Sequence, residues 1–139
     1  MQIPVMGNVP VRQHSDDAGA DLITPISVTF RPGQIIKLDL GVRAAIPQGY
    51  VGLLLPRSSV GAQGIRLMNT VGVIDSGFRG SWVAVLENAS SKPVALTAGQ
   101  RILQVLIVPI VLADFVATDA LPDSVRGSGG FGSTGGGTP

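Results

Sequence analysis

The residues with the clearest chemical potential lie between positions 69 and 80 of this 139-residue chain. Asp75 follows the apolar residues Val73 and Ile74, and the turn signal Ser76-Gly77 comes directly after it. Asp75 is thus a lone carboxylate where the predicted strand ends, the kind of group that can do acid–base chemistry. From these residues alone the commoner role is to cap a turn, because Asp is frequent at turns.

Two further stretches combine an Arg with hydroxyls. Positions 56–59 are Pro-Arg-Ser-Ser, whose serines suit a helix N-cap, and positions 126–135 hold one Arg, Ser and Thr residues, a single Phe and several glycines. The glycine-rich backbone of the second stretch, with its hydroxyls and Arg, suits a phosphate, because bare N–H groups approach it closely and the guanidinium pairs with it. By composition alone, the second stretch is also typical of a flexible tail. Three acids near a glycine, Asp16, Asp17 and Asp21, are equally typical of a solvated turn.

Composition limits the class of protein. A length of 139 residues indicates one domain, and a hydrophobic content of 45% indicates that this domain is globular and not disordered. Charged residues make up only 14%, against about 25% in an average soluble domain, which hints at surface covered by further copies of the chain. The net charge of +1 gives no reason to expect stable nucleic-acid binding or an acidic membrane as partner. There is no Cys, which excludes disulfides and Cys metal sites.

Targeting signals are not evident in the sequence. The N-terminal residues lack a basic region followed by an apolar run, so we do not expect a signal peptide. The longest apolar stretch, residues 102–113, is shorter than the roughly 20 residues that span a bilayer. We therefore expect a soluble protein of the cytoplasm.

Short strands separated by turn signals predict an all-β sandwich or barrel. Arg31-Pro-Gly33, Gly41 and Pro47-Gln-Gly49 punctuate the first half as hairpin turns would. Residues 71–74 and 82–87 are predicted to form a hairpin around Ser76-Gly77, and residues 60–64 one helical turn or a loop. An N-terminal edge strand or arm is expected over residues 1–12. The other expected strands are 26–30, 34–40, 42–46, 50–55, 65–68, 94–96 and 101–112.

Taken together, five segments in order resemble the five motifs of the trimeric deoxyuridine triphosphatases (dUTPases), over almost the whole chain. The segments are Ala18-Gly-Ala-Asp21-Leu22, Pro56-Arg-Ser-Ser59, Asn69-Thr-Val-Gly-Val-Ile-Asp-Ser-Gly-Phe-Arg-Gly80, Gly99-Gln-Arg-Ile-Leu-Gln104 and Arg126 to Gly135. The resemblance implies a jelly-roll-like β subunit and a homotrimer with active sites shared between chains. It implies a β-barrel core over 1–123 and a C-terminal lid over 124–139.

The reaction implied by the resemblance is hydrolysis of dUTP to dUMP and pyrophosphate with Mg²⁺. Asp75 matches the family's general base, which directs a water at the α-phosphorus, and Asp21 matches a carboxylate that steadies hydrated Mg²⁺ through a water. Arg101 is left open between a phosphate contact and a structural ion pair. The residues that match substrate-binding positions are Arg57, Ser58, Ser59, Asn69, Gly72, Val73, Ile74, Phe78, Gln104, Arg126, Phe131, Gly132, Ser133 and Thr134.

Within that set, the resemblance assigns parts of the substrate. Asn69 and the backbone up to Val73 are expected to read the uracil edge, and Phe131 to stack on the base once the lid closes. Arg126, Ser133 and Thr134 are expected to hold the γ-phosphate. Phe78 departs from the usual Tyr, but keeps the ring that packs on the deoxyribose. The segment 60–64 is one residue shorter than usual and lacks the common basic residue.

Two alternative functions remain open from the sequence. A dCTP deaminase, or a bifunctional deaminase–dUTPase, shares the fold. A regulatory protein that binds a partner in a nucleotide-dependent way could use the same site.

Overall fold

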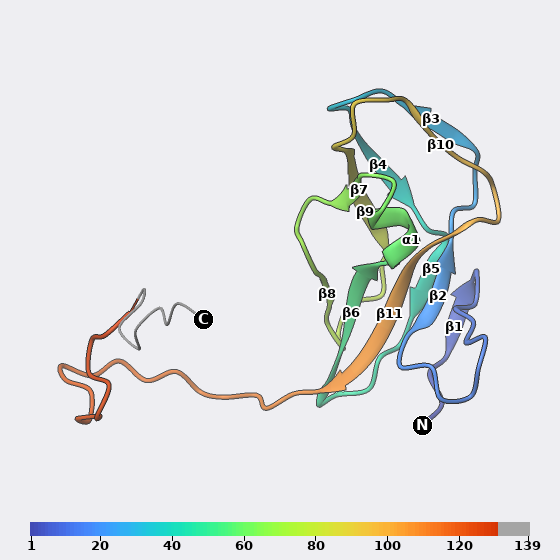
Figure 1. Cartoon of the computed structure of the whole chain (residues 1–139). Coiled ribbons are helices and arrows are strands. Elements are labelled where there is room, and N and C mark those ends of the chain that lie inside the picture. Colours follow the sequence, from blue (N-terminus) through green and yellow to red (C-terminus); the bar gives the residue numbers. More distant parts are fainter. Residues whose placement is uncertain (131–139) are drawn as a thin grey trace.

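The computed structural model describes residues 1–130 and contains strands with one short helix (Figure 1). The all-β class predicted from the sequence is confirmed. The elements are β1 (Val5–Gly7), β2 (Ala20–Ile23), β3 (Val28–Phe30), β4 (Ile35–Asp39), β5 (Val42–Ala44), β6 (Tyr50–Pro56), α1 (Ser58–Gly61), β7 (Ile65–Leu67), β8 (Gly72–Ile74), β9 (Val83–Asn88), β10 (Val94–Leu96) and β11 (Arg101–Pro109).

The strands form antiparallel sheets whose neighbours are distant in sequence. The largest sheet has the order β2-β11-β6-β8, and a second has the order β4-β9-β7. The remaining pairs are β1 with β5 and β3 with β10. Within the described chain, no strand pairs with the strand that follows it in sequence. This topology, in which strands pair across the chain and not with their sequence neighbours, is the jelly-roll-like arrangement that the family resemblance implies.

The predicted hairpin at residues 71–87 is wrong, although both of its strands exist. β8 pairs with β6, whereas β9 pairs with β4 and β7 in the other sheet. The turns at Gly33, Gly41 and Gly49 are also present, with φ of 72°, 66° and 82°, but the strands around them do not form hairpins. A turn signal fixes a local change of direction, and these turns carry the chain from one sheet to another.

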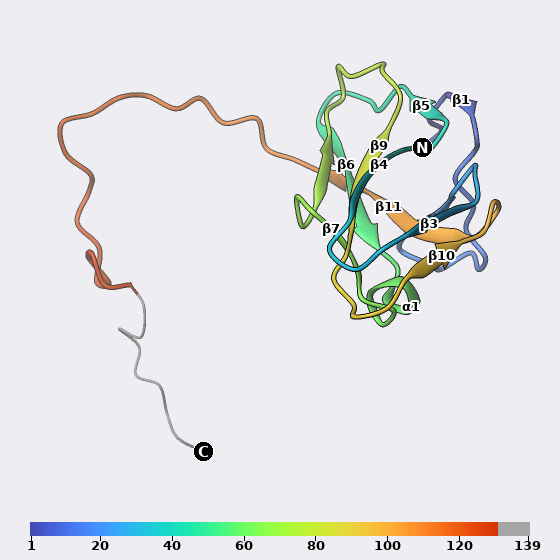
Figure 2. The ribbon, with the colours of Figure 1, turned by 90° about the horizontal axis from the view of Figure 1, so that it is seen from above.

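Two smaller differences concern strand limits. β2 occupies part of the acidic segment that was read as a turn, and it alternates buried Ala20 and Leu22 with half-buried Asp21 and Ile23. β11 ends at Pro109, three residues before the predicted end. Beyond Pro109 the chain leaves the body of the protein (Figures 1 and 2). Nearly all residues at 110–130 are exposed.

Apolar side chains of the two large sheets meet in one core. Trp82, Phe30, Leu22 and Leu103 are among the largest fully buried side chains. Asn88 is buried with them and is fully hydrogen-bonded: its amide nitrogen donates to the carbonyls of Phe30 and Lys92, at 3.0 and 2.8 Å. Among the described residues, no helix is long and apolar enough to cross a membrane.

Candidate active site

A polar cavity of about 530 Å³ lies beside β2, the polar end of β11 and the start of α1. β2 and β11 are neighbours in the largest sheet, and Gln104 lies directly opposite Asp21. β6 pairs with the other edge of β11, so Arg57, the residue after β6, is brought to the same place. The lining residues are Gln13, His14, Asp17, Ala18, Gly19, Asp21, Arg57, Ser58, Arg101 and Gln104.

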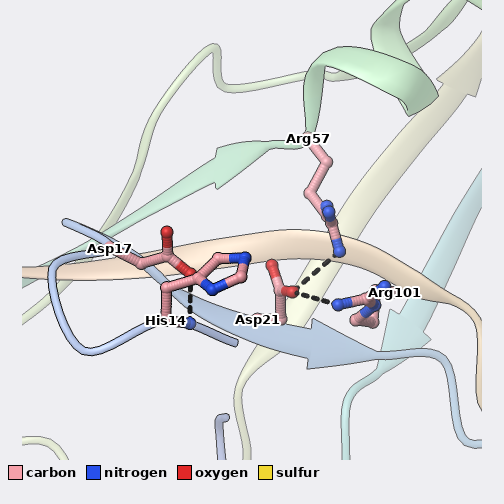
Figure 3. Close-up of polar contacts among 5 residues, drawn as sticks. All are labelled: His14, Asp17, Asp21, Arg57 and Arg101. Atoms are coloured by element: carbon pink, nitrogen blue, oxygen red, sulfur yellow. Dashed lines mark hydrogen bonds and ion pairs between the residues drawn. The ribbon is translucent and has the colours of Figure 1, made fainter. Parts of the chain in front are cut away.

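Asp21 is the residue that joins the charged side chains of this cavity: Arg57 and Arg101 both point toward its carboxylate (Figure 3). One of its carboxylate oxygens accepts from Arg57 at 2.7 Å and from Arg101 at 3.2 Å. The three side chains carry a combined charge of +1, because two guanidinium groups share one carboxylate. The Asp21 side chain is 14% exposed, and those of Arg57 and Arg101 are 29% and 42% exposed. Two partly exposed cations beside a cavity suit an anionic ligand such as phosphate.

Gly19 allows the Gln104 carboxamide to reach the cavity. A methyl group on Gly19 would lie 2.5 Å from the Gln104 side-chain oxygen and 3.1 Å from its Cβ. Real Cβ atoms do not approach other atoms so closely, so any other residue at position 19 would displace Gln104. Gly19 of the first motif therefore determines where the side chain of Gln104, in the fourth motif, can lie.

The loop before β2 adds polar residues that sequence reasoning missed. Gln13, His14 and Asp17 line the cavity. An oxygen of the Asp17 carboxylate accepts from the backbone N–H of His14 at 2.9 Å (Figure 3), and Arg12 Nε donates to the Asp17 carbonyl at 2.8 Å. The one clue in the sequence was that His14 is the chain's single histidine, seven residues before Asp21.

Asp75 lies away from this cavity. It follows Ile74, which pairs with Gly52 near the start of β6, whereas Arg57 follows the end of β6. At about 3.3 Å per residue, the five steps from Gly52 to Arg57 correspond to roughly 17 Å. One chain therefore presents Asp75 and the arginine cavity at opposite ends of the same strand.

The segment around Asp75 is exposed and held by backbone contacts. Arg79 donates to the carbonyls of Ser76 and Phe78, at 2.7 and 2.9 Å, which fixes the loop that follows the carboxylate. The Phe78 side chain is 42% exposed, and its ring lies against Gly80, where an added Cβ would be 2.5 Å from the ring. This places an accessible aromatic ring three residues after the candidate base.

The other predicted base-binding residues lie on β8 and the turn before it. β8 is an edge strand, so one side of its backbone is unpaired by any described strand. Gly72 and Ile74 are buried, while Val73 between them is 60% exposed. Asn69 is exposed in the preceding turn. The backbone of this segment is thus accessible to a ligand.

The remaining predicted residues do not join the cavity. Ser59 is exposed on α1, and Arg126 is exposed in the tail, where its Nε donates to the Gly129 carbonyl at 2.8 Å. Phe131, Gly132, Ser133 and Thr134 lie outside the described residues.

No group of three or more His, Cys, Asp or Glu residues within 1–130 could enclose a metal ion. A single carboxylate does fit Mg²⁺ that keeps several waters and takes its other ligands from phosphates. Of the two carboxylates that line the cavity, Asp17 and Asp21, Asp21 lies between the arginines, and only one of its two oxygens contacts them. The donor set therefore fits Mg²⁺ only when the ion arrives with a phosphate ligand.

Comparisons with known proteins agree with one another. Residues 6–135 match the family model described as dUTPase. The deoxyuridine 5'-triphosphate nucleotidohydrolase of Leifsonia xyli is 41% identical, over 97% of this chain and 91% of that protein. Its counterpart in Cutibacterium acnes is 46% identical, over 86% and 80%. The structure of Staphylococcus bacteriophage 80alpha dUTPase with dUpNHpp is similar with a TM-score of 0.85 and 26% identity, over 96% of this chain and 98% of that one.

Proposed function

Because the chain belongs to the dUTPase family, we propose that it hydrolyses dUTP to dUMP and pyrophosphate as a homotrimer that uses Mg²⁺. The observation that carries the proposal is the convergence of Asp21, Arg57, Ser58 and Gln104 on one polar cavity. These residues come from three of the five motifs, and they provide cations and hydrogen-bond donors where a triphosphate needs them.

The triphosphate occupies the arginine cavity in this proposal. Arg57 donates to phosphate oxygens in addition to its bond with Asp21, since a guanidinium carries five N–H donors. Ser58 and Gln104 add neutral donors from α1 and β11, whereas Ser59, the next residue of α1, is exposed and does not line the cavity. Arg101 keeps Arg57 and Asp21 in place through the shared carboxylate oxygen, which is the structural role considered for it above.

When bound with the triphosphate, Mg²⁺ neutralises charge that builds up on the phosphate oxygens. Asp21 is the residue of this chain that would hold the ion. The arginines that contact Asp21 limit how far its carboxylate can move. Asp21 would therefore link the arginine side of the cavity to the metal.

Asp75 supplies the general base. Its carboxylate orients a water for in-line attack on the α-phosphorus and accepts the proton as the new P–O bond forms. Pyrophosphate leaves on the opposite side. General-base assistance accelerates such reactions by about 10²–10⁴-fold. The rest of the rate acceleration must come from positioning of the substrate and electrostatic stabilisation of the transition state by the cavity.

The base and sugar bind along β8 and its flanking loops. Asn69 and the open backbone edge as far as Ile74 offer both donors and acceptors, which uracil requires. A thymine methyl is excluded by crowding, and cytosine is excluded because its donor pattern leaves buried polar groups unpaired. The exposed Phe78 ring packs on the deoxyribose, where the 2′-hydroxyl of a ribonucleotide would collide.

A complete site needs more than one copy of the chain. Asp75 and Arg57 lie at opposite ends of β6, roughly 17 Å apart by strand rise, yet both act on the same triphosphate. In a trimer, Asp75 of one chain can meet the cavity of another. The tail after Pro109 extends away from its own body (Figures 1 and 2), which suits a lid that reaches another site with Arg126, Phe131, Gly132, Ser133 and Thr134.

Pyrophosphate release measured with dUTP, dTTP, dCTP and UTP tests the proposal. We expect rapid release from dUTP alone, with Mg²⁺ present. Equal turnover of UTP and dUTP would contradict the role given to Phe78. Ammonia release from dCTP at a rate comparable to dUTP turnover would favour the deaminase alternative and reject the function proposed here.

A further inference from the structure

The arginine cavity contains as much negative as positive charge when all of its charged lining residues are counted. Arg57 and Arg101 each contribute a positive charge. Asp17 and Asp21 each contribute a negative charge and cancel them. A triphosphate binds best where positive charge exceeds negative charge. Among the described residues that line the cavity, the single histidine of the chain, His14, is the one that can add a further positive charge.

The backbone of His14 is held in place by the loop that precedes β2. Its N–H donates to the Asp17 carboxylate at 2.9 Å, and its carbonyl accepts from the Asp17 N–H at 3.3 Å. Arg12 holds the other end of this turn, because its guanidinium donates to the carbonyls of Asp17 and Ala18, at 2.8 and 3.4 Å. All of these bonds use the backbone of His14 or other residues, so its side chain can be replaced without breaking them.

The imidazole of His14 is available to a ligand. It is exposed, lines the cavity and extends from its loop toward the side on which Asp21 and Arg57 lie (Figure 3). It forms no hydrogen bond or ion pair with any residue within 1–130. An imidazole donates its N–H to phosphate oxygens, and an adjacent anion favours the protonated, positively charged form. A phosphate is therefore the kind of ligand that this position suits.

The position of Asp75 indicates which phosphates reach His14. In the proposed reaction, Asp75 of another chain directs a water at the α-phosphorus, so the α-phosphate lies at the boundary between two chains. Asp75 is not among the residues that line the cavity. The cavity itself is left for the two outer phosphates, which leave together as pyrophosphate.

We infer that His14 is a third cationic residue of the phosphate site and that it binds the two outer phosphates of dUTP and the pyrophosphate product. The inference rests on the proposed function and adds to it a residue outside the five motifs. The outer phosphates are present in the bound substrate as well as in the transition state. Loss of a contact to them should therefore raise KM and leave kcat nearly unchanged.

The experiment compares two substitutions of His14 in the full-length protein with Mg²⁺ present. His14→Gln removes the positive charge and keeps a hydrogen-bond donor, whereas His14→Arg keeps a cation with several N–H donors. Ser15→Gln is the matched control, because it introduces the same side chain at the neighbouring exposed position, which does not line the cavity. For each variant, calorimetry gives Kd for inorganic pyrophosphate and for dUMP. Steady-state assays give kcat and KM for dUTP, and thermal unfolding gives Tm.

For His14→Gln we expect Kd for pyrophosphate and KM for dUTP to rise about tenfold, with kcat and Kd for dUMP within about twofold of the wild-type values. His14→Arg should bind pyrophosphate at least as tightly as the wild-type protein. Ser15→Gln should match the wild-type protein in every measurement. The Tm of His14→Gln should be unchanged, because the bonds that hold the loop do not involve the imidazole.

Wild-type affinity for pyrophosphate in His14→Gln would overturn the inference, as would an equal loss of affinity in His14→Gln and His14→Arg. Equal weakening of pyrophosphate and dUMP binding would also overturn it, because the substitution would then disturb the cavity as a whole. Failure of the wild-type protein to hydrolyse dUTP would instead reject the proposed function, and the pyrophosphate affinities would still test the role of His14.

Discussion

At the scale of single residues, the separation of Asp75 from the arginine cavity makes its role testable without disturbing phosphate binding. Asp75→Asn keeps the size of the side chain and removes its basicity. We expect turnover of dUTP to fall by about 10²–10⁴-fold, the usual contribution of a general base. Binding of dUTP, measured by calorimetry, should persist, because Asp75 does not line the cavity. Undiminished turnover would remove Asp75 from the mechanism.

A second residue-scale prediction concerns Asp39, away from the site. A hydrogen bond from the Ser81 hydroxyl, followed by one from the Gly41 N–H, lowers the pKa of the Asp39 carboxyl below its ordinary value of 3.8. A lowered pKa in the folded state contributes stability above the unfolded-state pKa, and this stability is lost as the pH falls through the folded-state pKa. Ser81→Ala should raise the Asp39 pKa toward 3.8, as observed by carboxyl NMR titration.

The same titration contains an internal control. Arg66 donates to Glu87 and lowers its pKa, and that pair does not involve Ser81. The titration of Glu87 should therefore be unchanged in Ser81→Ala. A shift of both carboxyls would indicate a change in the β4-β9-β7 sheet rather than loss of one hydrogen bond.

At the scale of elements, Gly19 on the approach to β2 controls a side chain on β11. Gly19→Ala should push the Gln104 carboxamide away from the cavity, because the added Cβ would lie 2.5 Å from its oxygen. Loss of one hydrogen bond to a charged ligand is worth about 1.5–3 kcal/mol, so we expect KM for dUTP to rise at least about tenfold.

The matched control for that substitution is Gly61→Ala on α1. An added Cβ at Gly61 meets nothing within 4 Å, and Gly61 does not have positive φ. Its kinetics should match those of the wild-type protein. If both variants raise KM equally, the effect comes from the general loss of a glycine, and the packing of Gln104 on Gly19 is not its cause.

Asn88 gives the clearest stability prediction, because it joins β9 to β3 and to the following loop. Its amide nitrogen donates to Phe30 and Lys92, and its oxygen accepts from the backbone and hydroxyl of Ser90. Asn88→Ala leaves buried backbone groups unpaired, each at a cost of about 1–3 kcal/mol. We expect chemical unfolding to show a loss of about 3 kcal/mol, with kcat of the folded protein retained. A loss below about 0.5 kcal/mol would contradict this account.

The positions of the strands could be predicted from the sequence better than which strands pair with each other. Strands such as Val94–Leu96 were placed correctly, because turn signals such as Gly33, Gly49 and Gly99 mark real positive-φ positions. Pairing was not predictable from spacing, because within the described chain each strand pairs with one that is distant in sequence. The convergence of Asp21, Arg57 and Gln104 depends on that pairing, so spacing did not predict it either. It was anticipated only through the resemblance to a family.

There are also physical reasons why some residues of the cavity could not be predicted from the sequence. His14 and Asp17 enter the cavity through a loop held by side chain–backbone bonds, which leave no periodic pattern.

At the scale of the whole molecule, the exposed tail leads to a truncation prediction. Residues 110–130 contribute no strand and no side chain to the core. Deleting residues 126–139 should therefore leave Tm nearly unchanged and lower dUTP turnover strongly, since the proposed lid carries Arg126 and Phe131. Sedimentation should still show a trimer. If the truncated protein fails to fold, the tail is part of the architecture and its assignment as a lid is wrong.

The most demanding whole-molecule prediction follows from the two ends of β6. If Asp75 and the Arg57 cavity act together only across chains, two inactive variants can complement each other. Asp75→Asn and Arg57→Gln should each be inactive alone. In trimers formed by co-expressing them in equal amounts, random assembly should make about a quarter of the sites wild type in both residues. Pyrophosphate release from dUTP should recover to about that fraction of the wild-type rate.

As a control, co-expression of Asp75→Asn with the Asp75→Asn/Arg57→Gln double variant should recover no activity, because neither chain then supplies Asp75. If the two single variants also recovered nothing while assembling as mixed trimers, the site would have to be complete within one chain, against the separation of these residues along the strand.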